Sequence, residues 1–429
     1  MSLSAVTTSI LIAVTLAGCC LPPSPKGAPD AGGAPDASGC AEGTHDDGAG
    51  ACVQGDRCAP GFAFEGGACV ARPEPAARPI RFAWRALSPL DGPRTLHTAT
   101  ALEDGRVLVA GGLTTRQTDQ GALDSPLDAA TLFDPEAGTQ KPAGRISQAR
   151  SQHAAVRLKD GRVMIIGGLG SAGAQASVDI FDPALDRWEV APPLAHARFR
   201  HTATALDDGR VLVVGGDKAN LQTVAQTEIF DPASGQWTSD APLMTPRLTH
   251  AAVRLKDGRV LVVGGIARGR LTTGSAEIYD PRTSLWVEAA SLPVASQWHS
   301  ALRLDDGRVL VVGGVNAPQQ ALIYDPAKDT WERAADIPRG RREHAAALLS
   351  DGRALIFGGR GPNGVALRSA DLFDPATGRW ASAPSMPIAR ADFSLAALAG
   401  DRLLVLGGID QEDTPTQDAV IWEPTPDDP

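Results

Sequence analysis

The chain is poor in several residue types, and each shortage narrows what the protein can be. No long stretch repeats apolar residues at the 3.6-residue period of an amphipathic helix, which argues against a helical fold. Basic residues do not outnumber acidic ones, and the formal net charge is −10. Phosphate binding needs a basic face, so nucleic acid is not expected as a main partner. All six cysteines lie before residue 70, which leaves the remaining chain of about 360 residues without disulfides.

Glycine and proline, in contrast, are abundant, with 46 and 33 copies among 429 residues. They separate short runs of Val, Leu and Ile, a pattern that favours an all-β fold with many tight turns. Length alone suggests two or three domains, but internal repeats can make one domain of this length.

The first residues have the features of an export signal. Ile10 to Ala17 form an apolar run too short to span a bilayer as a stable helix. The run ends in Leu16-Ala17-Gly18-Cys19, which resembles the bacterial lipobox, where cleavage precedes a cysteine that is then acylated. We therefore predict a signal peptide at 1–18 and a lipid anchor on Cys19, which would attach the exported protein to the envelope at the outer membrane, on its periplasmic side or at the cell surface. An ordinary secretory signal is the alternative, and no Lys or Arg precedes Ile10.

Four more cysteines follow in a segment that has almost no apolar core of its own: Cys40, Cys52, Cys58 and Cys69. An exported segment of this kind is expected to be held by disulfides, and four cysteines allow three pairings among which the sequence does not choose. The run from Cys58 to Cys69 resembles the last loop of an EGF-like module. A four-cysteine zinc site is the alternative, but the usual CxxC pairs are missing. We predict this disulfide segment at 40–70, between a flexible linker at 19–39 and a stiffer linker at 71–81.

One phrase recurs seven times in the rest of the chain. A diglycine follows each of seven apolar runs, at Gly111-Gly112, Gly167-Gly168, Gly215-Gly216, Gly264-Gly265, Gly313-Gly314, Gly358-Gly359 and Gly407-Gly408. Fourteen residues before each first glycine stands a histidine or, in the last copy, a phenylalanine: His97, His153, His201, His250, His299, His344 and Phe393. Between the two lie two strands joined by a tight turn such as Asp104-Gly105, for which we expect a two-residue hairpin with positive φ at both residues.

A third strand follows each diglycine and ends in an aromatic residue and Asp-Pro, as in Phe181-Asp182-Pro183. Six residues after the aspartate a tryptophan opens a fourth strand, except in the first copy, which has Gln140. This pattern of diglycine, spaced Tyr or Phe and spaced Trp resembles the kelch repeat, over residues 82–424. The resemblance implies four antiparallel strands per blade and blades arranged radially around an axial channel.

The two ends of the repeat region complete one blade. The last copy stops at its third strand, with Trp422 in the aromatic position, and Trp84 precedes the first copy without a repeat of its own. We therefore predict that 82–87 is the fourth strand of blade seven, which removes the open edges of a linear array. The predicted fold is an all-β, seven-bladed propeller closed by an N-terminal strand, preceded by the small Cys-rich segment and followed by a tail at 425–429.

Length varies almost only between strands two and three of each copy, so the loops there are the expected binding elements. On the same face an arginine enters nearly every blade: Arg94, Arg150, Arg198, Arg247, Arg341 and Arg390, with Ser296 in blade five. A ring of guanidinium groups is a candidate receptor for carboxylates, as in some eukaryotic kelch proteins. The alternative is that a residue repeated in every blade is a structural bracket to backbone carbonyls. The repeated histidines are expected to be hydrogen-bonding residues, too far apart to share one metal ion, so we predict no metal site.

The residue just before each histidine differs in every blade: Leu96, Gln152, Arg200, Thr249, Trp298, Glu343 and Asp392. Because repetition reflects the scaffold, the positions where it fails are the better candidates for specificity. We expect Arg200, Trp298 and Glu343 to contact the ligand together with the arginine ring. Trp298 could stack on a sugar or an aromatic side chain, or merely fill space in blade five.

These patterns favour a non-catalytic binding module on the cell envelope that recognises a protein or glycan, without a cofactor. The alternative is an enzyme of the sugar epimerase or lyase type found among kelch propellers, and a purely structural envelope protein is a third possibility. A copper radical oxidase like galactose oxidase is not expected. That site needs two tyrosines, one of them cross-linked to a cysteine, whereas Tyr279 and Tyr324 both occupy repeated positions. No nucleophile–base pair stands out, so we predict no catalytic residue.

Overall fold

The computed structural model describes residues 44–46, 52–54, 62–65, 68–71, 82–118, 121–218 and 222–425. The predicted signal peptide, the anchor at Cys19 and nearly all of the predicted linkers and tail lie outside these residues. The described strands belong to two separate units, a small one before residue 82 and a large one from Phe82 to Pro424. No helix with the length and apolar character of a membrane span occurs in the described ranges.

The small unit consists of two antiparallel hairpins. One pairs β1 (Thr44–Asp46) with β2 (Cys52–Gln54), and the other pairs β3 (Phe62–Glu65) with β4 (Ala68–Ala71). Cys40 and Cys58 lie outside the described residues, and only the backbone is described for Cys52 and Cys69. The disulfides therefore stay a prediction.

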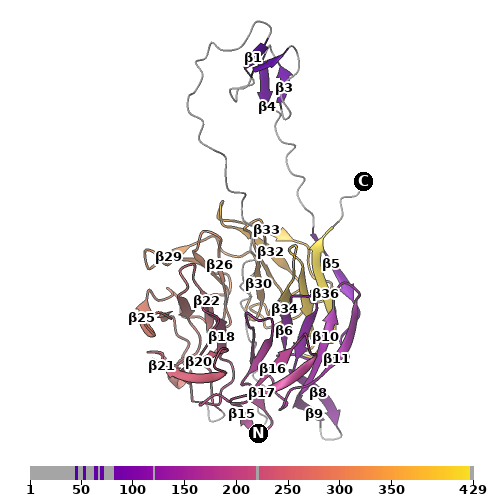
Figure 1. The fold of residues 1–429 in the computed structure, drawn as a ribbon, viewed down its shortest axis with the longest axis vertical. Coiled ribbons are helices and arrows are strands. Elements are labelled where there is room, and N and C mark those ends of the chain that lie inside the picture. The colour runs from indigo at the N-terminus through magenta and orange to yellow at the C-terminus, as the bar shows by residue number, and fades with distance from the viewer. Residues whose placement is uncertain are drawn as a thin grey trace. The chain divides into compact units, whose positions relative to one another are not determined.

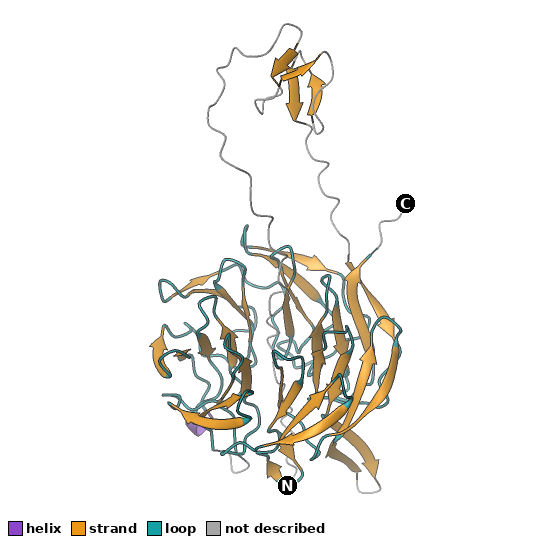
Figure 2. Cartoon of the chain, viewed as in Figure 1, coloured by secondary structure: helices purple, strands orange, loops and turns teal. Residues whose placement is uncertain are grey.

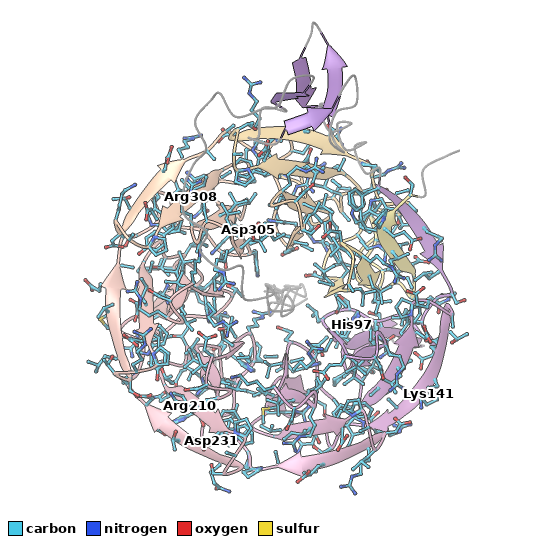
Figure 3. The ribbon with its side chains drawn as sticks, turned by 45° about the horizontal axis from the view of Figure 1, so that its top comes forward. His97, Lys141, Arg210, Asp231, Asp305 and Arg308 are labelled. Carbon is cyan, nitrogen blue, oxygen red and sulfur yellow. The ribbon has the colours of Figure 1, made fainter. Side chains whose placement is uncertain are left out.

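The large unit is the predicted propeller. Seven four-stranded antiparallel sheets, here called blades one to seven, stand around a central axis (Figures 1 and 3). From the axis outward, blades one to four are formed by β6 (Thr98–Ala101), β7 (Val107–Ala110), β10 (Ala129–Asp134) and β11 (Thr139–Arg145); β12 (Ala154–Arg157), β13 (Val163–Ile166), β16 (Val178–Asp182) and β17 (Arg187–Ala191); β18 (Thr202–Ala205), β19 (Val211–Val214), β20 (Thr227–Asp231) and β21 (Gln236–Asp240); β22 (Ala251–Arg254), β23 (Val260–Val263), β24 (Ala276–Asp280) and β25 (Leu285–Ala289).

Blades five to seven follow the same order. They are formed by β26 (Ser300–Arg303), β27 (Val309–Val312), β28 (Ala321–Asp325) and β29 (Thr330–Arg333); β30 (Ala345–Leu348), β31 (Ala354–Phe357), β32 (Ala370–Asp374) and β33 (Arg379–Ala383); β34 (Ser394–Ala397), β35 (Leu403–Leu406), β36 (Ala419–Pro424) and β5 (Phe82–Leu87). In Figure 3, His97 lies near the axis and Lys141, on β11, lies at the outer rim.

Blade seven contains the closure that the sequence predicted. Strand β5 pairs with β36, and Trp84 stands opposite Trp422 in the register. The ring centroids of the two tryptophans are 5.3 Å apart in an edge-on contact. The first and last strands of the propeller thus belong to one sheet, so that blade seven, like the others, has four paired strands.

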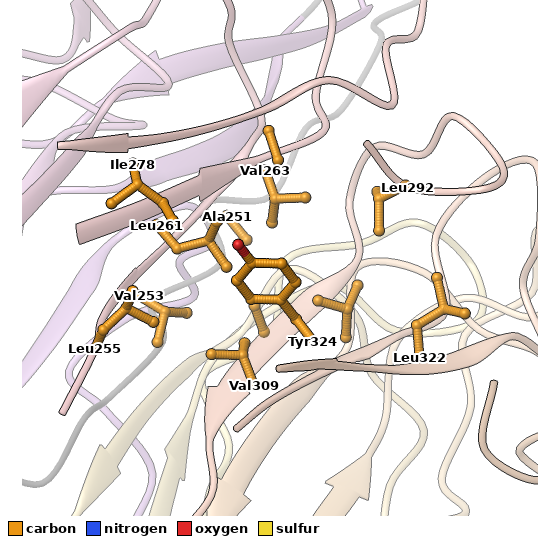
Figure 4. Close-up of a cluster of buried hydrophobic side chains, with 13 residues drawn as sticks. Ala251, Val253, Leu255, Leu261, Val263, Ile278, Leu292, Val309, Leu322 and Tyr324 are labelled. Carbon is orange, nitrogen blue, oxygen red and sulfur yellow. The ribbon is translucent and has the colours of Figure 1, made fainter. Parts of the chain in front are cut away.

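The hydrophobic core lies between the blades. The second strand of every blade is buried along its whole length, as its continuous run of apolar residues requires. Figure 4 shows one such cluster, in which Tyr324 of blade five packs against Val253, Leu261 and Val263 of blade four. Each blade therefore covers its neighbour, and a blade alone would expose both faces of its sheet.

The turn between the first two strands differs from the expected two-residue hairpin. In blade three the amide of Leu206 donates to the carbonyl oxygen of Arg210 (2.8 Å), so three residues form the loop. Only Gly209 has a left-handed φ, of +95°, and Asp208 does not. The Asp208 carboxylate instead accepts from the amide of Arg210 (2.9 Å) and forms an ion pair with its side chain. The Asp-Gly-Arg sequence therefore forms a bulged turn, and the prediction of positive φ at both residues was wrong for this turn.

Indole groups connect each blade to the one before it. Six tryptophans of the outermost strands donate their Nε1–H to backbone carbonyls of the preceding blade at 2.6–3.0 Å: Trp84, Trp188, Trp237, Trp286, Trp331 and Trp380. In blade one Gln140 does the same, because its Nε2 donates to the carbonyl of Pro89 (2.9 Å). The apparent exception in the repeat thus keeps the same inter-blade bond.

The diglycines connect the blades near the axis. In every blade the amide of the second glycine donates to the backbone carbonyl of the residue that enters the next blade, Arg or Ser296, at 2.8–2.9 Å. At Gly264 a Cβ atom would lie 2.5 Å from the His299 ring and 2.6 Å from the Ser296 carbonyl. Any side chain would separate the two blades, which is why the repeat requires glycine here.

We predict that Trp380→Phe lowers the free energy of unfolding by about 1 kcal/mol, the net value of one hydrogen bond. The phenyl ring keeps the contact with Phe373 but cannot donate to the Ala335 carbonyl. Denaturant unfolding measures the change, with the exposed Arg379→Gln on the same strand as a control. A Phe variant as stable as the parent would show that this bond does not hold the blades together.

Candidate functional site

The loops between the second and third strands and the connections from one blade to the next lie on one face, here called the loop face. It carries two extra hairpins, β8 (Leu113–Thr118) with β9 (Gly121–Pro126) and β14 (Leu169–Gly170) with β15 (Gly173–Ala174), and the 3-10 helix η1 (Arg268–Arg270). Figures 1 and 2 show these elements at the same end of the propeller. The variable loops therefore surround the entry to the axis on this face.

The repeated arginines lie inside the blades. Arg247 donates from Nη1 to the carbonyl oxygens of Gly264 (2.9 Å) and Ser275 (2.7 Å). Its Nη2 donates to the carboxylate of Glu277 (2.7 Å), and both side chains are at most 1% exposed. Its backbone carbonyl accepts from the preceding blade at Gly216. One residue thus fastens its own blade and joins it to the previous one.

The other arginines of the ring are equally buried: Arg94, Arg150, Arg198, Arg341 and Arg390. Arg150, Arg198 and Arg341 repeat the bonds of Arg247 to two carbonyls and an acid. Arg390 keeps the two carbonyl bonds, and Arg94 donates to Asp91 instead. This geometry supports the structural bracket and not the expected ring of ligand-binding guanidinium groups, because the side chains point into the sheets and not toward a ligand.

In blade five the arginine and its acid are absent together. Blade five replaces the arginine with Ser296, whose Oγ donates to Gly313, and places Leu322 where the neighbouring blades have an acid such as Glu277. A buried carboxylate without its cation is strongly destabilising, so both charges are absent from this blade. This joint loss could have been recognised in the sequence, and it marks the arginines as part of the scaffold.

The repeated histidines are buried as well, at 0–5% exposure, against the glycines of the preceding blade. His153, His250 and His344 each bond through Nε2 to the hydroxyl that begins the inner strand of the preceding blade: Thr98, Thr202 and Ser300. Burial lowers the pKa of all six, to about 3 for His153 and about 4 for His299. They are neutral packing residues at physiological pH. Among the described residues, no three His, Cys, Asp or Glu side chains are grouped as metal ligands.

The residues before the histidines share an unusual backbone conformation. All seven have a left-handed φ of 51–57°, although none is glycine: Leu96, Gln152, Arg200, Thr249, Trp298, Glu343 and Asp392. At five of the seven junctions the amide of one of them donates to the carbonyl of its counterpart in the preceding blade, as Gln152 does to Leu96 (3.0 Å). These residues, here called the mouth ring, therefore form a belt around the axis on the loop face, where the side chain is free to vary.

One part of the mouth ring is charged. Arg200 of blade three donates from Nε to Gln152 (2.5 Å), and its guanidinium lies 5.4 Å from the ring centre of Phe199. Burial lowers the pKa of Arg200 to about 10, with opposing contributions from Asp217, Asp392 and Glu343. These acids belong to blades three, seven and six, so Arg200 lies in the electrostatic field of acids from three blades. Here we call Arg200, Asp217, Glu343, Arg360 and Asp392 the mouth cluster.

The acids of the mouth cluster are buried. Glu343 forms an ion pair with Arg360 (3.0 Å), which also reaches Asp413 of blade seven (2.5 Å). Burial raises the pKa of Glu343, opposed by Arg342 and Arg360. Burial and the neighbouring Glu343 raise the pKa of Asp392 well above its usual value. Buried charges are unfavourable, and four of the seven mouth-ring positions carry an uncharged residue. The scaffold therefore does not require the charges of the mouth cluster, which makes this cluster a candidate functional site.

Two members of this cluster were not predicted from the sequence. Asp217 and Arg360 directly follow a diglycine, at a position that is Leu, Ile or Val in the other five blades. Asp217 is fully buried, and within the described residues its side chain has one ion pair, to Arg270 at 3.2 Å. The two exceptions to an apolar repeat position were visible in the sequence. What the sequence did not show is that they lie beside the exceptions at Arg200 and Glu343.

Trp298 lies at the less charged part of the mouth ring. It is half-buried, and its Nε1–H donates to no acceptor in the described part of the chain. Neither the hydroxyl of Thr249 nor the amide oxygen of Gln297 has a hydrogen-bond partner there. The ligand contact of Trp298 stays a prediction.

The two tyrosines do not take part in this site. Tyr279 and Tyr324 pack against Trp286 and Trp331 of their own blades, and their hydroxyls donate to Asp240 and Asp329. Burial and these carboxylates raise the pKa of both phenols. They are core residues of blades four and five.

Fold and repeat geometry define a seven-bladed propeller of the kelch class. Two family models agree: the KLHDC2/KLHL20/DRC7 Kelch-repeats domain matches residues 96–314, and the Kelch motif matches residues 341–387. The chain belongs to the kelch-repeat family. No curated protein matches the chain.

A solved structure is similar over most of the propeller. It is a fungal alcohol oxidase of the AA5 family in complex with copper, with a TM-score of 0.64 and 18% sequence identity. The match covers 80% of this chain and 76% of that one. At this identity the likeness shows the fold alone.

We predict that Arg247→Ala lowers the free energy of unfolding by about 3–5 kcal/mol, because Glu277 is left buried without its cation. The double variant Arg247→Ser/Glu277→Leu, which copies blade five, should lose less. Chemical denaturation of the two variants checks this order. A single variant as stable as the double would contradict the bracket.

We predict that acid destabilises the propeller through its histidines. Their pKa is near 6.5 in the unfolded chain and lower in the fold, so unfolding takes up protons below about pH 6.5. The stabilisation is complete above that pH and is lost as pH falls toward about 4 for His299, at about 1.4 kcal/mol per pH unit. His299→Phe copies Phe393 and removes one group that takes up a proton on unfolding. Between pH 6 and 4.5 it should therefore reduce the slope of the unfolding free energy against pH by about 1.4 kcal/mol per pH unit. An unchanged slope would contradict this.

Proposed function

We propose that this protein is a non-catalytic binding module, exported and held on the cell envelope by a lipid on Cys19, that captures a protein or glycan with its loop face. The observation that carries the proposal is the position of the residues that break the repeat. Charged and aromatic exceptions gather in the mouth ring, whereas the opposite face repeats the same turns from blade to blade.

Exposed apolar side chains support a contact surface on the same face. Ten large hydrophobic residues are exposed in the described part of the chain, and six of them lie in loops or connections of the loop face: Leu123, Met244, Leu271, Val294, Val365 and Ile388. Met244, Leu271 and Val294 all belong to blade four or its two connections. Apolar groups beside a charged centre are typical of a surface that a partner covers.

A sugar epimerase or lyase is the second candidate, and one observation favours it. The carboxyl group of Asp392 has a raised pKa beside Glu343 and in the field of Arg200 and Arg360. A buried carboxyl with a raised pKa can act as a general acid. Incubation of the protein with envelope glycans would then give products that an Asp392→Asn variant does not form.

We predict that the full-length protein, purified in detergent, captures a saturable partner from an envelope fraction or a glycan array. Trp298→Ala or Leu271→Asp should weaken this capture at least tenfold with little change in thermal unfolding. Val190→Asp, on the exposed outer strand of blade two, is the matched control. Capture that survives both loop-face variants but is lost in the control would place the binding surface on the rim.

A further inference from the structure

The mouth cluster contains carboxylate oxygens that accept no hydrogen bond, because too few donors lie near them. Both carboxylate oxygens of Asp392 and both of Asp217 accept no hydrogen bond from any residue in the described ranges. Yet these side chains are only 4% and 0% exposed. Burying a carboxylate without donors is unfavourable by several kcal/mol. A group rich in N–H or O–H donors would relieve this situation.

The cations that are present are engaged elsewhere. Arg360 lies between Glu343 and Asp413, and no ion pair within the described chain includes Asp392. Arg270 is 3.2 Å from Asp217, in a contact without hydrogen-bond geometry. Arg200 donates to Gln152 and faces Asp217, Asp392 and Glu343 at longer range. The negative charge of Asp392 is thus not balanced by direct contact.

The surroundings indicate what kind of molecule carries the donors. A net charge of −10 attracts cations toward the protein, and the exposed Met244, Leu271 and Val294 lie on the same face as the cluster. A free sugar would supply hydrogen-bond donors but would not cover this apolar surface. A protein segment with a basic side chain and apolar neighbours would do both.

We propose that the mouth cluster binds the ammonium or guanidinium group of a lysine or arginine side chain on a protein partner, at the carboxylates of Asp217 and Asp392. This inference rests on the proposed binding function of the loop face and names its ligand class. The cation donates the hydrogen bonds that the two carboxylates lack, while apolar residues of the partner cover the loops around blade four.

The test uses four short peptides and the full-length protein in detergent. The probes are acetyl-Leu-Arg-Leu-amide, acetyl-Gly-Arg-Gly-amide and the two corresponding citrulline peptides, which keep the shape of arginine without its charge. Ligand-observed NMR titration gives the affinities. We expect the arginine peptides to bind at least tenfold more tightly than their citrulline counterparts, and the leucine-flanked peptide more tightly than the glycine-flanked one. Equal binding of the two leucine peptides would rule out the cation. Glycine flanks that bind as well as leucine flanks would rule out the protein source in favour of a small free cation.

Variants locate the site. Asp217→Asn/Asp392→Asn should weaken binding of the leucine-flanked arginine peptide at least tenfold, whereas Glu412→Gln, an exposed acid on the blade-seven loop, should leave it unchanged. Arg200→Gln should strengthen binding several-fold, because it removes a competing cation. This gain cannot come from a folding defect. Unaltered binding in both the double variant and Arg200→Gln would overturn the proposal. If envelope capture persists while all arginine peptides fail to bind, the inference fails and the proposed function does not.

Discussion

A short backbone hydrogen bond joins each blade to the next, from the amide of the second glycine of a diglycine to the carbonyl that enters the following blade. The distance is 2.8–2.9 Å at all seven junctions, including Gly408 to Arg94, where the last blade meets the first. Such an approach leaves no room for a Cβ atom, and it presses the ring of the next histidine against the first glycine. Glycine, histidine and entering arginine therefore form one unit of the scaffold, repeated around the axis.

The scaffold explains why the repeated arginines and histidines are not part of the candidate functional site. The arginines and histidines recur in nearly every blade because every junction needs the same bonds, and their charge or ring is enclosed within the structure. The left-handed residue before the histidine has the opposite property. Its backbone belongs to the junction, but its side chain does not take part in the repeated bonds, so the seven blades carry seven different residues there. Charges that the scaffold does not need gather at this position and next to it.

Most of the fold could be predicted from the sequence, because the intervals between glycine, histidine and aromatic residues are nearly constant. Seven blades, their strand order and the pairing of 82–87 with the last blade follow from those intervals. The turn at Asp208-Gly209 was mispredicted, since the pair alone does not reveal that the aspartate binds the following arginine. The sequence gives the face on which the repeated arginines lie but not the direction of their side chains, which are buried inside the blades. The mouth cluster could only be found in part. Asp217 and Arg360 break an apolar position in the sequence, but their proximity to Glu343 and Asp392 depends on how blades three, six and seven face one another.

Native-state hydrogen exchange at the seven diglycines tests the account most directly. The amides of Gly112, Gly168, Gly216, Gly265, Gly314, Gly359 and Gly408 should all exchange slowly and at similar rates, because each is bonded to the next blade. Slow exchange of Gly408 matters most, since its bond closes the ring. Fast exchange at Gly408, with protection at the other six, would mean an open array and not a closed propeller.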